Sequence, residues 1–344
     1  MPTTNHPAAT VNAVRKVYPG GRVALNGVTL TIDRHAVTAI AGPNGSGKTT
    51  LLKMLAGTLS PSSGSIEVLG VDPASRVDPL RSQMAFASQD VALDPEMTGA
   101  QTLRLFAALY GIPRDQSVQK VQNLADAFQL TRHLGSRVQA FSGGLRRRLH
   151  LAIAFLHDPE LLLLDEPTAG LDPSGRELLW GLIRSHALRA TSAVLVTHDL
   201  HEAERYCDRV AILARGNLLA LGSPKDLIGA HSGWTVELTL EETIAEDDAR
   251  LRALGSVDGV TALRAKDRRV LIELSEDRQI KHSVLSKLSS VGLEVSRFRA
   301  FEPDLAGAYF RLTGESADRS PTAGAAGDPQ SARAGLGRRR EAAS

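Results

Sequence analysis

The chain carries a phosphate-loop pattern, and this pattern constrains the fold more than any other feature of the sequence. Residues 42–49 read Gly-Pro-Asn-Gly-Ser-Gly-Lys-Thr, which fits the pattern G-x-x-x-x-G-K-[ST]. A short apolar run, residues 37–41, precedes the loop, and residues 50–59 follow it with a helical pattern. Strand, glycine loop and helix in this order predict one βα unit of a parallel α/β sheet.

The loop residues predict a site for the phosphates of a nucleotide. Glycines allow backbone N–H groups to converge on phosphate oxygens, and the following helix directs its positive end at the same anion. Lys48 is expected to neutralise the β- and γ-phosphates, and the Thr49 hydroxyl is expected to ligate Mg²⁺. The predicted nucleotide-binding residues of this loop are Gly42, Pro43, Asn44, Gly45, Ser46, Gly47, Lys48, Thr49 and Thr50.

An apolar run that ends in two acidic residues supplies the groups that phosphoryl transfer needs. Residues 161–164 are four leucines, and Asp165 and Glu166 follow them. A continuous apolar run of this length is typical of a strand buried on both faces. Asp165 is expected to hold Mg²⁺, and Glu166 to orient or deprotonate the attacking water. The alternative is a core strand with a solvated acidic end.

A second glycine motif stands before a predicted helix. Residues 141–144 read Phe-Ser-Gly-Gly, and residues 145–156 have a helical pattern. Ser142 is a natural N-cap, and the two glycines leave backbone N–H groups open to an anion. An ordinary capped helix is the alternative. Three arginines at 146–148 are interpreted as a solvated face of this helix.

The set of motifs and their order resemble the ATP-binding cassette family. Residues 42–50 resemble its Walker A motif, and Asp165-Glu166 resembles Walker B with the catalytic glutamate. Residues 169–172 resemble the D-loop of the family. The family signature corresponds to Ser142, Gly143 and Gly144. The resemblance covers about residues 11–230 and implies the nucleotide-binding fold of that family.

The resemblance implies roles for three further residues. Gln89, after the apolar run 84–87, resembles the Q-loop glutamine, which contacts Mg²⁺ and the membrane partner. His198 resembles the switch histidine that touches the γ-phosphate, and Tyr18 stands where the family places an aromatic that stacks on adenine. ATP and Mg²⁺ are thus the implied ligands. The implied catalytic residues are Glu166, His198, Lys48 and Gln89, and the implied metal residues are Thr49, Gln89 and Asp165.

Three stretches are similar to exporter ATPases of the daunorubicin-resistance type: residues 141–149, 197–212 and 309–314. Those proteins pair with a separate multispanning permease. The resemblance therefore implies an ATP-hydrolysing exporter subunit, peripheral at the cytoplasmic face of the cell membrane. It also implies a head-to-tail homodimer, in which ATP on Lys48 of one chain meets the signature of the other. ATP then drives closure of the dimer, and hydrolysis releases it.

The signature departs from the family pattern at two positions. The family usually has Leu first and Gln fifth, whereas this chain has Phe141 and Leu145. One polar side-chain contact across the site is thereby lost. We expect the activity to be kept and its rate to be tuned.

Other roles for a cassette ATPase remain as alternatives. DNA-repair types insert a long coiled coil before the signature, and the stretch between Lys48 and Ser142 is too short for one. Translation types usually carry two cassettes, and this sequence shows one. A P-loop kinase would lack the signature and His198. A transporter ATPase of another substrate class is the remaining alternative.

The N-terminal domain is expected to carry a helical insertion at about residues 95–150, with helices at 98–110 and 116–128. This insertion is expected to dock the permease. Some of the apolar residues that follow Gln89 are predicted to line a groove for a permease helix; these residues are Leu93, Met97, Leu103, Phe106 and Tyr110. The alternative is that Phe106 and Tyr110 pack inside the insertion.

Residues 231–314 predict a second, small α+β domain of the split βαβ, ferredoxin-like type. Its expected strands are 234–240, 260–263, 270–274 and 293–298, and its expected helices are 246–254 and 279–288. A last helix, 304–312, is expected to close it. Because no second phosphate loop is present, we predict a regulatory or dimer-supporting role, and nucleotide binding by a chain ending near Ser223. Residues 315–344 are expected to be disordered.

The composition excludes several other classes. A chain of 344 residues with 42% hydrophobic and 23% charged residues is typical of about two globular domains. The net charge of +2 gives no global case for nucleic acid. Cys207 is the single cysteine and excludes an internal disulfide or a multi-cysteine metal site. No signal peptide is expected, and no run approaches the about 20 apolar residues of a membrane span.

Overall fold

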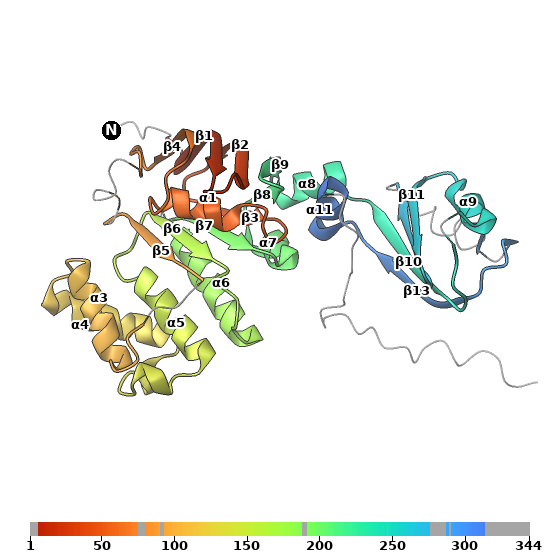
Figure 1. The fold of residues 1–344 in the computed structure, drawn as a ribbon. Helices are drawn as coiled ribbons and strands as arrows, with labels where there is room; N and C mark the ends of the chain where they lie inside the picture. The colour runs from red at the N-terminus through yellow and green to blue at the C-terminus, as the bar shows by residue number, and fades with distance from the viewer. Residues whose placement is uncertain are drawn as a thin grey trace, which may run out of the picture.

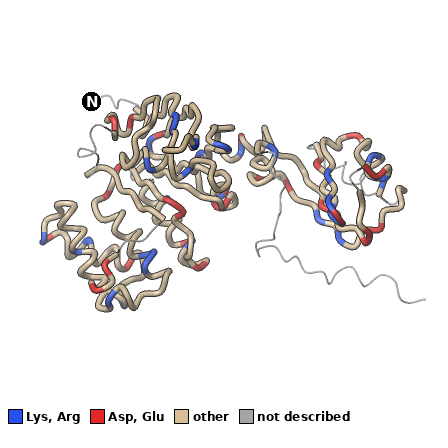
Figure 2. Tube along the Cα trace, viewed as in Figure 1, with Lys and Arg blue, Asp and Glu red and all other residues tan. Residues whose placement is uncertain are grey.

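The computed structural model describes residues 6–74, 80, 82–89, 93–187, 191–245, 247–275, 287–288 and 290–313. Two domains are set apart from one another, with α8 and α11 between them (Figure 1). Lys, Arg, Asp and Glu are interspersed along both domains (Figure 2). Among the described residues, none of the helices has both the length and the apolar character needed to cross a bilayer.

The larger sheet of the N-terminal domain has six strands. In spatial order they are β5 (Met84–Ala87), β6 (Leu161–Asp165), β7 (Ser192–Thr197), β3 (Val37–Ala41), β8 (Arg209–Ala214) and β9 (Asn217–Gly222). The first five are parallel, and β9 runs antiparallel to β8. The strands β3, β6 and β7 are buried along their whole length, as expected of central parallel strands. Their carboxyl ends meet at one edge of the sheet.

A smaller antiparallel sheet covers one face of the domain. Its order is β2 (Val23–Ile32), β1 (Ala9–Val17) and β4 (Ser63–Val68). Helix α1 (Lys48–Leu55) packs between the two sheets and buries Leu51, Leu52 and Leu55 in their shared core. This packing fixes the position of the loop that precedes the helix. On the opposite face lie α5 (Gly143–Ala154), α6 (Pro173–Ala187) and α7 (Leu200–Tyr206).

The helical insertion is present as predicted. Its elements are α3 (Gly99–Leu109), α4 (Arg114–Ala127) and the short 3₁₀ turns η1 (Thr131–His133) and η2 (Val138–Ala140), and they precede α5. Thr98 and Gln101 form a reciprocal capping box at the start of α3, which explains why the helix begins there. Helices α3, α4 and α5 lie together below the sheets (Figure 1).

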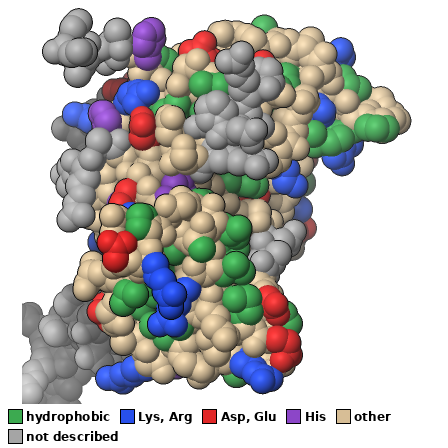
Figure 3. Space-filling model, turned by 90° about the vertical axis from the view of Figure 1, so that its left-hand side faces the viewer, with side chains coloured by type: hydrophobic (Ala, Val, Ile, Leu, Met, Phe, Trp, Pro, Cys, Tyr) green, Lys and Arg blue, Asp and Glu red, His purple; other side chains and the backbone are tan. Residues whose placement is uncertain are grey.

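The apolar residues expected to line a permease groove mostly pack inside this insertion. Leu103 is fully buried, and Phe106 and Tyr110 are half-buried against the core. The groove interpretation is therefore wrong for Leu103. The exposed large apolar side chains of the insertion are Leu105, Leu109 and Val118. Hydrophobic side chains are visible on the face of the helical insertion that Figure 3 presents.

The C-terminal domain is an antiparallel sheet in the order β11-β12-β10-β13. Its elements are β10 (Trp234–Leu240), α9 (Ala249–Gly255), β11 (Val260–Lys266), β12 (Arg269–Leu274) and β13 (Val295–Phe301). This is the strand order of a split βαβ fold, as predicted. The predicted helix 279–288 lies mostly outside the described residues, and the predicted disordered tail lies wholly outside them.

The last helix does not close the C-terminal domain, which corrects the prediction from sequence. Helix α11 (Leu305–Thr313) packs against α8 (Pro224–His231), α7 and β9 of the N-terminal domain. Leu305 and Tyr309 belong to the core that α5, α6 and α7 cover, and so does Leu227 of α8. The backbone N–H of Leu305 also donates to Glu204 of α7 at 2.9 Å. The apolar face of α11 therefore completes the N-terminal core.

Candidate functional site

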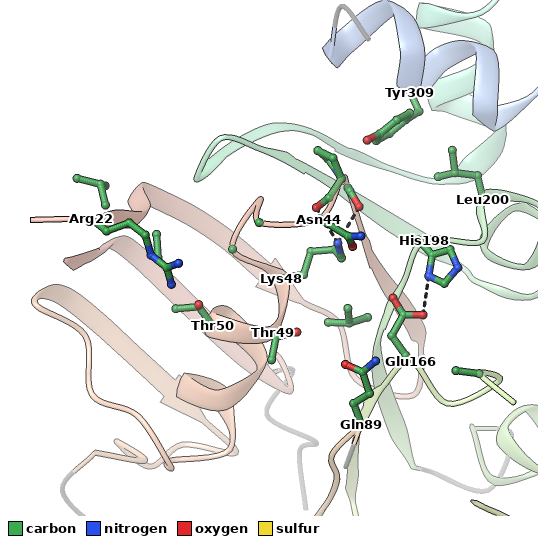
Figure 4. A pocket seen from close by; sticks show the side chains of 18 of the residues that line it. Arg22, Asn44, Lys48, Thr49, Thr50, Gln89, Glu166, His198, Leu200 and Tyr309 are labelled. Atoms are coloured by element: carbon green, nitrogen blue, oxygen red, sulfur yellow. Dashed lines mark hydrogen bonds and ion pairs between the residues drawn. The ribbon is translucent and has the colours of Figure 1, made fainter. Parts of the chain in front are cut away.

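A cavity of about 680 Å³ opens at the carboxyl ends of β3, β6 and β7. Its lining comes from segments far apart in the chain: the glycine loop, the residues after β5, β6 and β7, and α11 (Figure 4). The predicted site residues among them are Gly42, Pro43, Asn44, Gly45, Gly47, Lys48, Thr49, Thr50, Gln89, Glu166 and His198. The parallel topology thus brings most of the predicted residues into one place.

The glycines of the loop are required by its geometry. Gly47 has φ +105°, and a Cβ there would lie 2.5 Å from the Ala24 carbonyl oxygen. A Cβ on Gly42 would lie 2.1 Å from the Leu213 carbonyl oxygen. Since Gly47 is the N-cap, α1 begins at Lys48, two residues earlier than the sequence pattern predicts. The loop therefore leads directly into a helix N-terminus that faces the cavity.

Lys48 is a buried cation at the base of the loop. Its side chain is 6% exposed, and Nζ donates to the carbonyl oxygens of Gly42 at 2.7 Å and Pro43 at 2.9 Å. Burial lowers the pKa of Lys48, and the nearby carboxylates of Asp165 and Glu166 oppose that shift. A desolvated ammonium in a loop of this kind is suited to bind an anion such as phosphate.

Thr49 and Asp165 bring two hard oxygen donors together. The Thr49 hydroxyl donates to Asp165 Oδ1 at 3.3 Å. Burial raises the pKa of Asp165, and the hydrogen bond from Thr49 opposes this shift. Within the described ranges no group of three or more His, Cys, Asp or Glu could hold a metal. The Thr49–Asp165 pair still fits Mg²⁺, which takes few protein ligands alongside substrate phosphates and waters.

Glu166 and His198 contact one another in the lining of the cavity. Glu166 Oε2 lies 2.8 Å from His198 Nδ1, and the side chains are 13% and 71% exposed, respectively. Figure 4 shows this contact between the turn after β6 and the turn after β7. Glu166 adopts φ +49°, a left-handed conformation that is uncommon for Glu and marks a specifically held position. The arrangement places a carboxylate and an imidazole on the same side of the loop.

Gln89 and Tyr18 differ in position: of the two, only Gln89 is among the described residues that line the cavity. Gln89 is exposed and lines the cavity from the segment after β5. Tyr18 is not among the lining residues of the part of the chain that the structure describes. Its hydroxyl lies 3.3 Å from Thr50 Oγ1, and the Arg22 guanidinium lies 5.1 Å from its ring centre. Arg22 itself lines the cavity, so the aromatic ring lies behind this cation at the edge of the site.

The signature residues lie outside the cavity of their own chain. Ser142 caps α5 by accepting from the Leu145 backbone N–H at 3.2 Å. Ser142 and Gly143 are exposed, and a Cβ on Gly143 would meet no atom within 4 Å. Neither they nor Gly144 appear in the described lining of the cavity. The structure therefore does not unite the two predicted anion sites within one chain.

Two features of the site are not predicted by the sequence. Tyr309 and Phe310 of α11 line the cavity, as does Leu200 of α7, and Figure 4 shows Tyr309 on the same side of the cavity as Leu200. The sequence places them only in a C-terminal stretch that resembles exporter ATPases, since helical periodicity does not show which domain a helix joins.

The interpretation of the arginines at 146–148 as a solvated face is wrong for Arg147, which is 4% exposed. Arg147 is four residues before the buried Leu151. The i, i+4 spacing was the signal that places it on the buried face of α5.

Comparisons with known proteins agree with this geometry. A family model described as ABC transporter matches residues 25–169. The chain is 35% identical to daunorubicin resistance ATP-binding protein DrrA3 of Streptomyces coeruleorubidus, covering 90% of this chain and 96% of that protein. It is 34% identical to Nod factor export ATP-binding protein I of Rhizobium meliloti (strain 1021), covering 89% and 88%.

Solved structures are similar over the N-terminal part. An ATP-binding subunit of an ABC transporter has 32% identity and a TM-score of 0.61, covering 65% of this chain and 92% of that one. The cbiO1 protein of Clostridium perfringens, part of the ABC transporter complex cbiONQ, has 29% identity and a TM-score of 0.59. With this site geometry and relatives matched over nearly their whole length, the chain belongs to the ATP-binding cassette family, as an ABC transporter ATP-binding protein.

Proposed function

We propose that this protein is the ATP-hydrolysing subunit of an ABC exporter that powers a separate membrane permease. The observation that carries this proposal is one cavity lined by the buried cation Lys48, by Thr49, whose hydroxyl bonds the Asp165 carboxylate, and by the Glu166–His198 pair. Its relatives are named for drug resistance and for Nod factor export. By analogy with them, we place the protein peripherally at the cytoplasmic face of the cell membrane.

The residues divide the work of phosphoryl transfer. Lys48 and the backbone N–H groups of residues 42–50 hold the phosphates of ATP, and Thr49 and Asp165 hold Mg²⁺ with Gln89 nearby. When bound, Mg²⁺ neutralises charge on the phosphate oxygens. Glu166 accepts a proton from the attacking water, and His198 holds the Glu166 carboxylate from the other side. Tyr18 and Arg22 supply a flat face for adenine at the edge of the site.

The signature supports a dimer as the active unit. Ser142, Gly143 and Gly144 are separate from the cavity of their own chain and stand at the exposed start of α5. A second copy of the chain, facing the first head to tail, would bring its signature to the nucleotide on Lys48. ATP binds that closed dimer better than the open one, and this difference drives the switch.

A substitution at Gly143 tests the dimer. Since a Cβ on Gly143 meets nothing within 4 Å, Gly143→Glu should leave the folded protomer intact. In a closed dimer the added carboxylate would face the phosphates of the partner's nucleotide. We expect unchanged nucleotide binding by one chain, no ATP-dependent dimer on size exclusion with light scattering, and loss of ATPase activity. Gly181→Glu, on the exposed face of α6 where a Cβ also meets nothing, is the matched control.

Two further assignments belong to this proposal. The permease docks on the helical insertion, and the C-terminal domain regulates or supports the dimer without chemistry of its own. The test is co-purification with a membrane protein encoded beside this chain and stimulation of the ATPase by that protein in lipid vesicles. If the protein hydrolyses ATP but neither co-purifies with such a membrane protein nor is stimulated by it, the result would favour a non-transport ABC ATPase or a transporter of another class.

A further inference from the structure

Arg147 is the most deeply buried charged residue of α5, the helix that the signature residue Ser142 caps. It is 4% exposed, whereas Arg146 is exposed and Arg148 is half-buried. A guanidinium carries five N–H donors and no acceptor, so a buried one is costly unless each donor finds an oxygen. The partners of Arg147 therefore show what this charge is used for.

Among the described residues, every hydrogen bond of the Arg147 side chain goes to a backbone carbonyl. Nε donates to Pro167 at 3.4 Å. One terminal nitrogen donates to Ser88 at 2.8 Å and Gln89 at 3.3 Å. The other donates to Asp165 at 2.7 Å and Glu166 at 2.8 Å. One side chain of α5 thus bonds the segment after β5 and the turn after β6.

The two bonds on the second nitrogen hold Glu166 in its unusual conformation. The carbonyl of Asp165 and the carbonyl of Glu166 belong to the two peptide planes on either side of the Glu166 Cα atom. Fixing both planes fixes φ and ψ, and hence the direction in which the Glu166 side chain leaves the backbone. Glu166 has φ +49°, a region in which a non-glycine residue persists only when its surroundings hold it there.

The charge of Arg147 adds to this geometry. Attraction between the guanidinium and the carboxylates of Asp165 and Glu166 opposes the effect of burial, which by itself lowers the pKa of Arg147. Ser142 is the N-cap of the same helix. Any displacement of α5 relative to the sheet must therefore carry the segments of Gln89 and Glu166 with it or break these bonds.

We propose that Arg147 is a positioning residue for ATP hydrolysis: its guanidinium sets the Glu166 backbone so that the carboxylate points at the site, and ties Gln89 to the same helix. This inference rests on the proposed ATPase function. Arg147 is not itself among the cavity-lining residues of the described chain. It acts through the backbone carbonyls of two residues that are, Gln89 and Glu166.

The test is Arg147→Lys. An ammonium keeps the charge but cannot reach five carbonyls in three directions. Because a displacement of about 1 Å can cost about 10²-fold in rate, we expect kcat to fall about 10–100-fold. The dissociation constant for ATP should stay within about twofold, since the hydrogen bonds of the Arg147 side chain in the described structure go to residues 88–89 and 165–167 and not to the Lys48 loop. Arg146→Lys, one residue earlier on the same helix and exposed, is the matched control.

A double substitution separates positioning from general support of the fold. If Arg147 acts through Glu166, adding Arg147→Lys to Glu166→Gln should lower the residual rate by less than about threefold, since coupled residues are not additive. Full additivity in this cycle, or an Arg147→Lys protein with the wild-type kcat, would overturn the proposal. The proposal would also be overturned if Arg147→Lys lowered the ATP affinity and the melting temperature in proportion to the fall in kcat.

The remaining outcomes are also decisive. If Arg147→Lys fails to fold, Arg147→Gln repeats the test with two amide donors and no buried charge, and failure of both to fold rejects a positioning role in favour of a structural one. An inactive wild-type protein would contradict the proposed ATPase function. An active wild-type protein with an unaffected Arg147→Lys variant would contradict this inference alone.

Discussion

The backbone N–H of Asp304 donates to the Ser232 hydroxyl at 3.2 Å. Ser232 follows α8, and Asp304 precedes α11, so the two ends of the C-terminal sheet domain meet at one point. Both flanking helices pack on the N-terminal core. The C-terminal sheet domain is thus an insertion between two helices of the N-terminal domain, rather than an appendage at its end.

The first prediction follows from this contact. Replacing residues 234–302 by a short Gly-Ser linker should retain ATP binding within about threefold, because the insertion points are adjacent and flexible short loops close at small entropic cost. A chain that ends at Ser223 should instead lose α8 and α11, and with them Leu227, Leu305 and Tyr309 of the core.

The structure therefore revises the expectation that such a truncated chain binds nucleotide normally. Circular dichroism melts and a fluorescent nucleotide titration on both proteins are the measurements. A melting temperature of the Ser223 truncation equal to that of the full chain would contradict the role given to α11.

The second prediction concerns the Glu166–His198 pair. Glu166→Gln keeps the shape but removes the base, and loss of a general base typically lowers kcat by about 10²–10⁴-fold. The variant should bind ATP and accumulate as a closed dimer on size exclusion. Glu160→Gln, at the opposite end of β6 and paired with Arg34, is the control. Unchanged turnover by Glu166→Gln would remove Glu166 from the mechanism.

The third prediction concerns the buried cation. Lys48→Ala should weaken ATP binding by at least about 100-fold, because charge-assisted hydrogen bonds contribute about 1.5–3 kcal/mol each. Lys53→Ala changes an exposed lysine of the same helix and should bind ATP normally. Isothermal titration with ATP compares them. Affinity equal to wild type in Lys48→Ala would show that this loop is not the phosphate site.

The fourth prediction is a pH dependence of stability. Burial, aided by the charge of Arg147, lowers the pKa of His150 from 6.5 to about 4. Between these two values the unfolded chain binds a proton that the folded chain does not. Stability from this residue is therefore fully present above pH 6.5 and is lost as the pH falls toward 4, by up to about 1.4 kcal/mol per pH unit.

Urea unfolding at several pH values between 7 and 4.5 measures this effect. His150→Gln should unfold with a shallower pH dependence than the wild type over the acidic part of this range. His35→Gln substitutes a histidine outside α5 and provides the comparison. Parallel curves for the wild type and His150→Gln would show that His150 takes up its proton in the folded state as readily as in the unfolded chain.

The fifth prediction distinguishes core from docking residues in the helical insertion. Phe106 packs against the core and against Tyr110, with ring centres 6.5 Å apart. Phe106→Ala should lower the free energy of unfolding, and with it the melting temperature. Because Phe106 is only half-buried, the loss should be smaller than the about 3–5 kcal/mol typical of a fully buried phenylalanine. Leu109, which is 69% exposed, should tolerate Leu109→Ser in the isolated protein, and any loss should appear as weaker stimulation by the proposed permease. The reverse pattern would contradict the assignment.

The sequence by itself determined the local chemistry of the site. The loop at residues 42–49, the leucine strand before Asp165 and the glycines after Ser142 each specify a short-range geometry: a positive φ, a strand buried on both faces, a capped helix. Such features depend on neighbouring residues alone, and periodicity reveals them. The split βαβ order of the C-terminal domain followed from the same alternation of short patterns.

Only the tertiary structure decided which elements pack together. The apolar face of α11 has the same periodicity whether it covers the C-terminal sheet or the N-terminal core, and here it joins the N-terminal core. Arg147 carries a charge that favours solvent, yet hydrogen bonds to five carbonyl oxygens from distant segments offset the cost of burying it. Hydrophobic burial has no preferred direction, so a local pattern does not show which core α11 joins. Every residue has a carbonyl group, so a local pattern does not show which carbonyl oxygens Arg147 bonds.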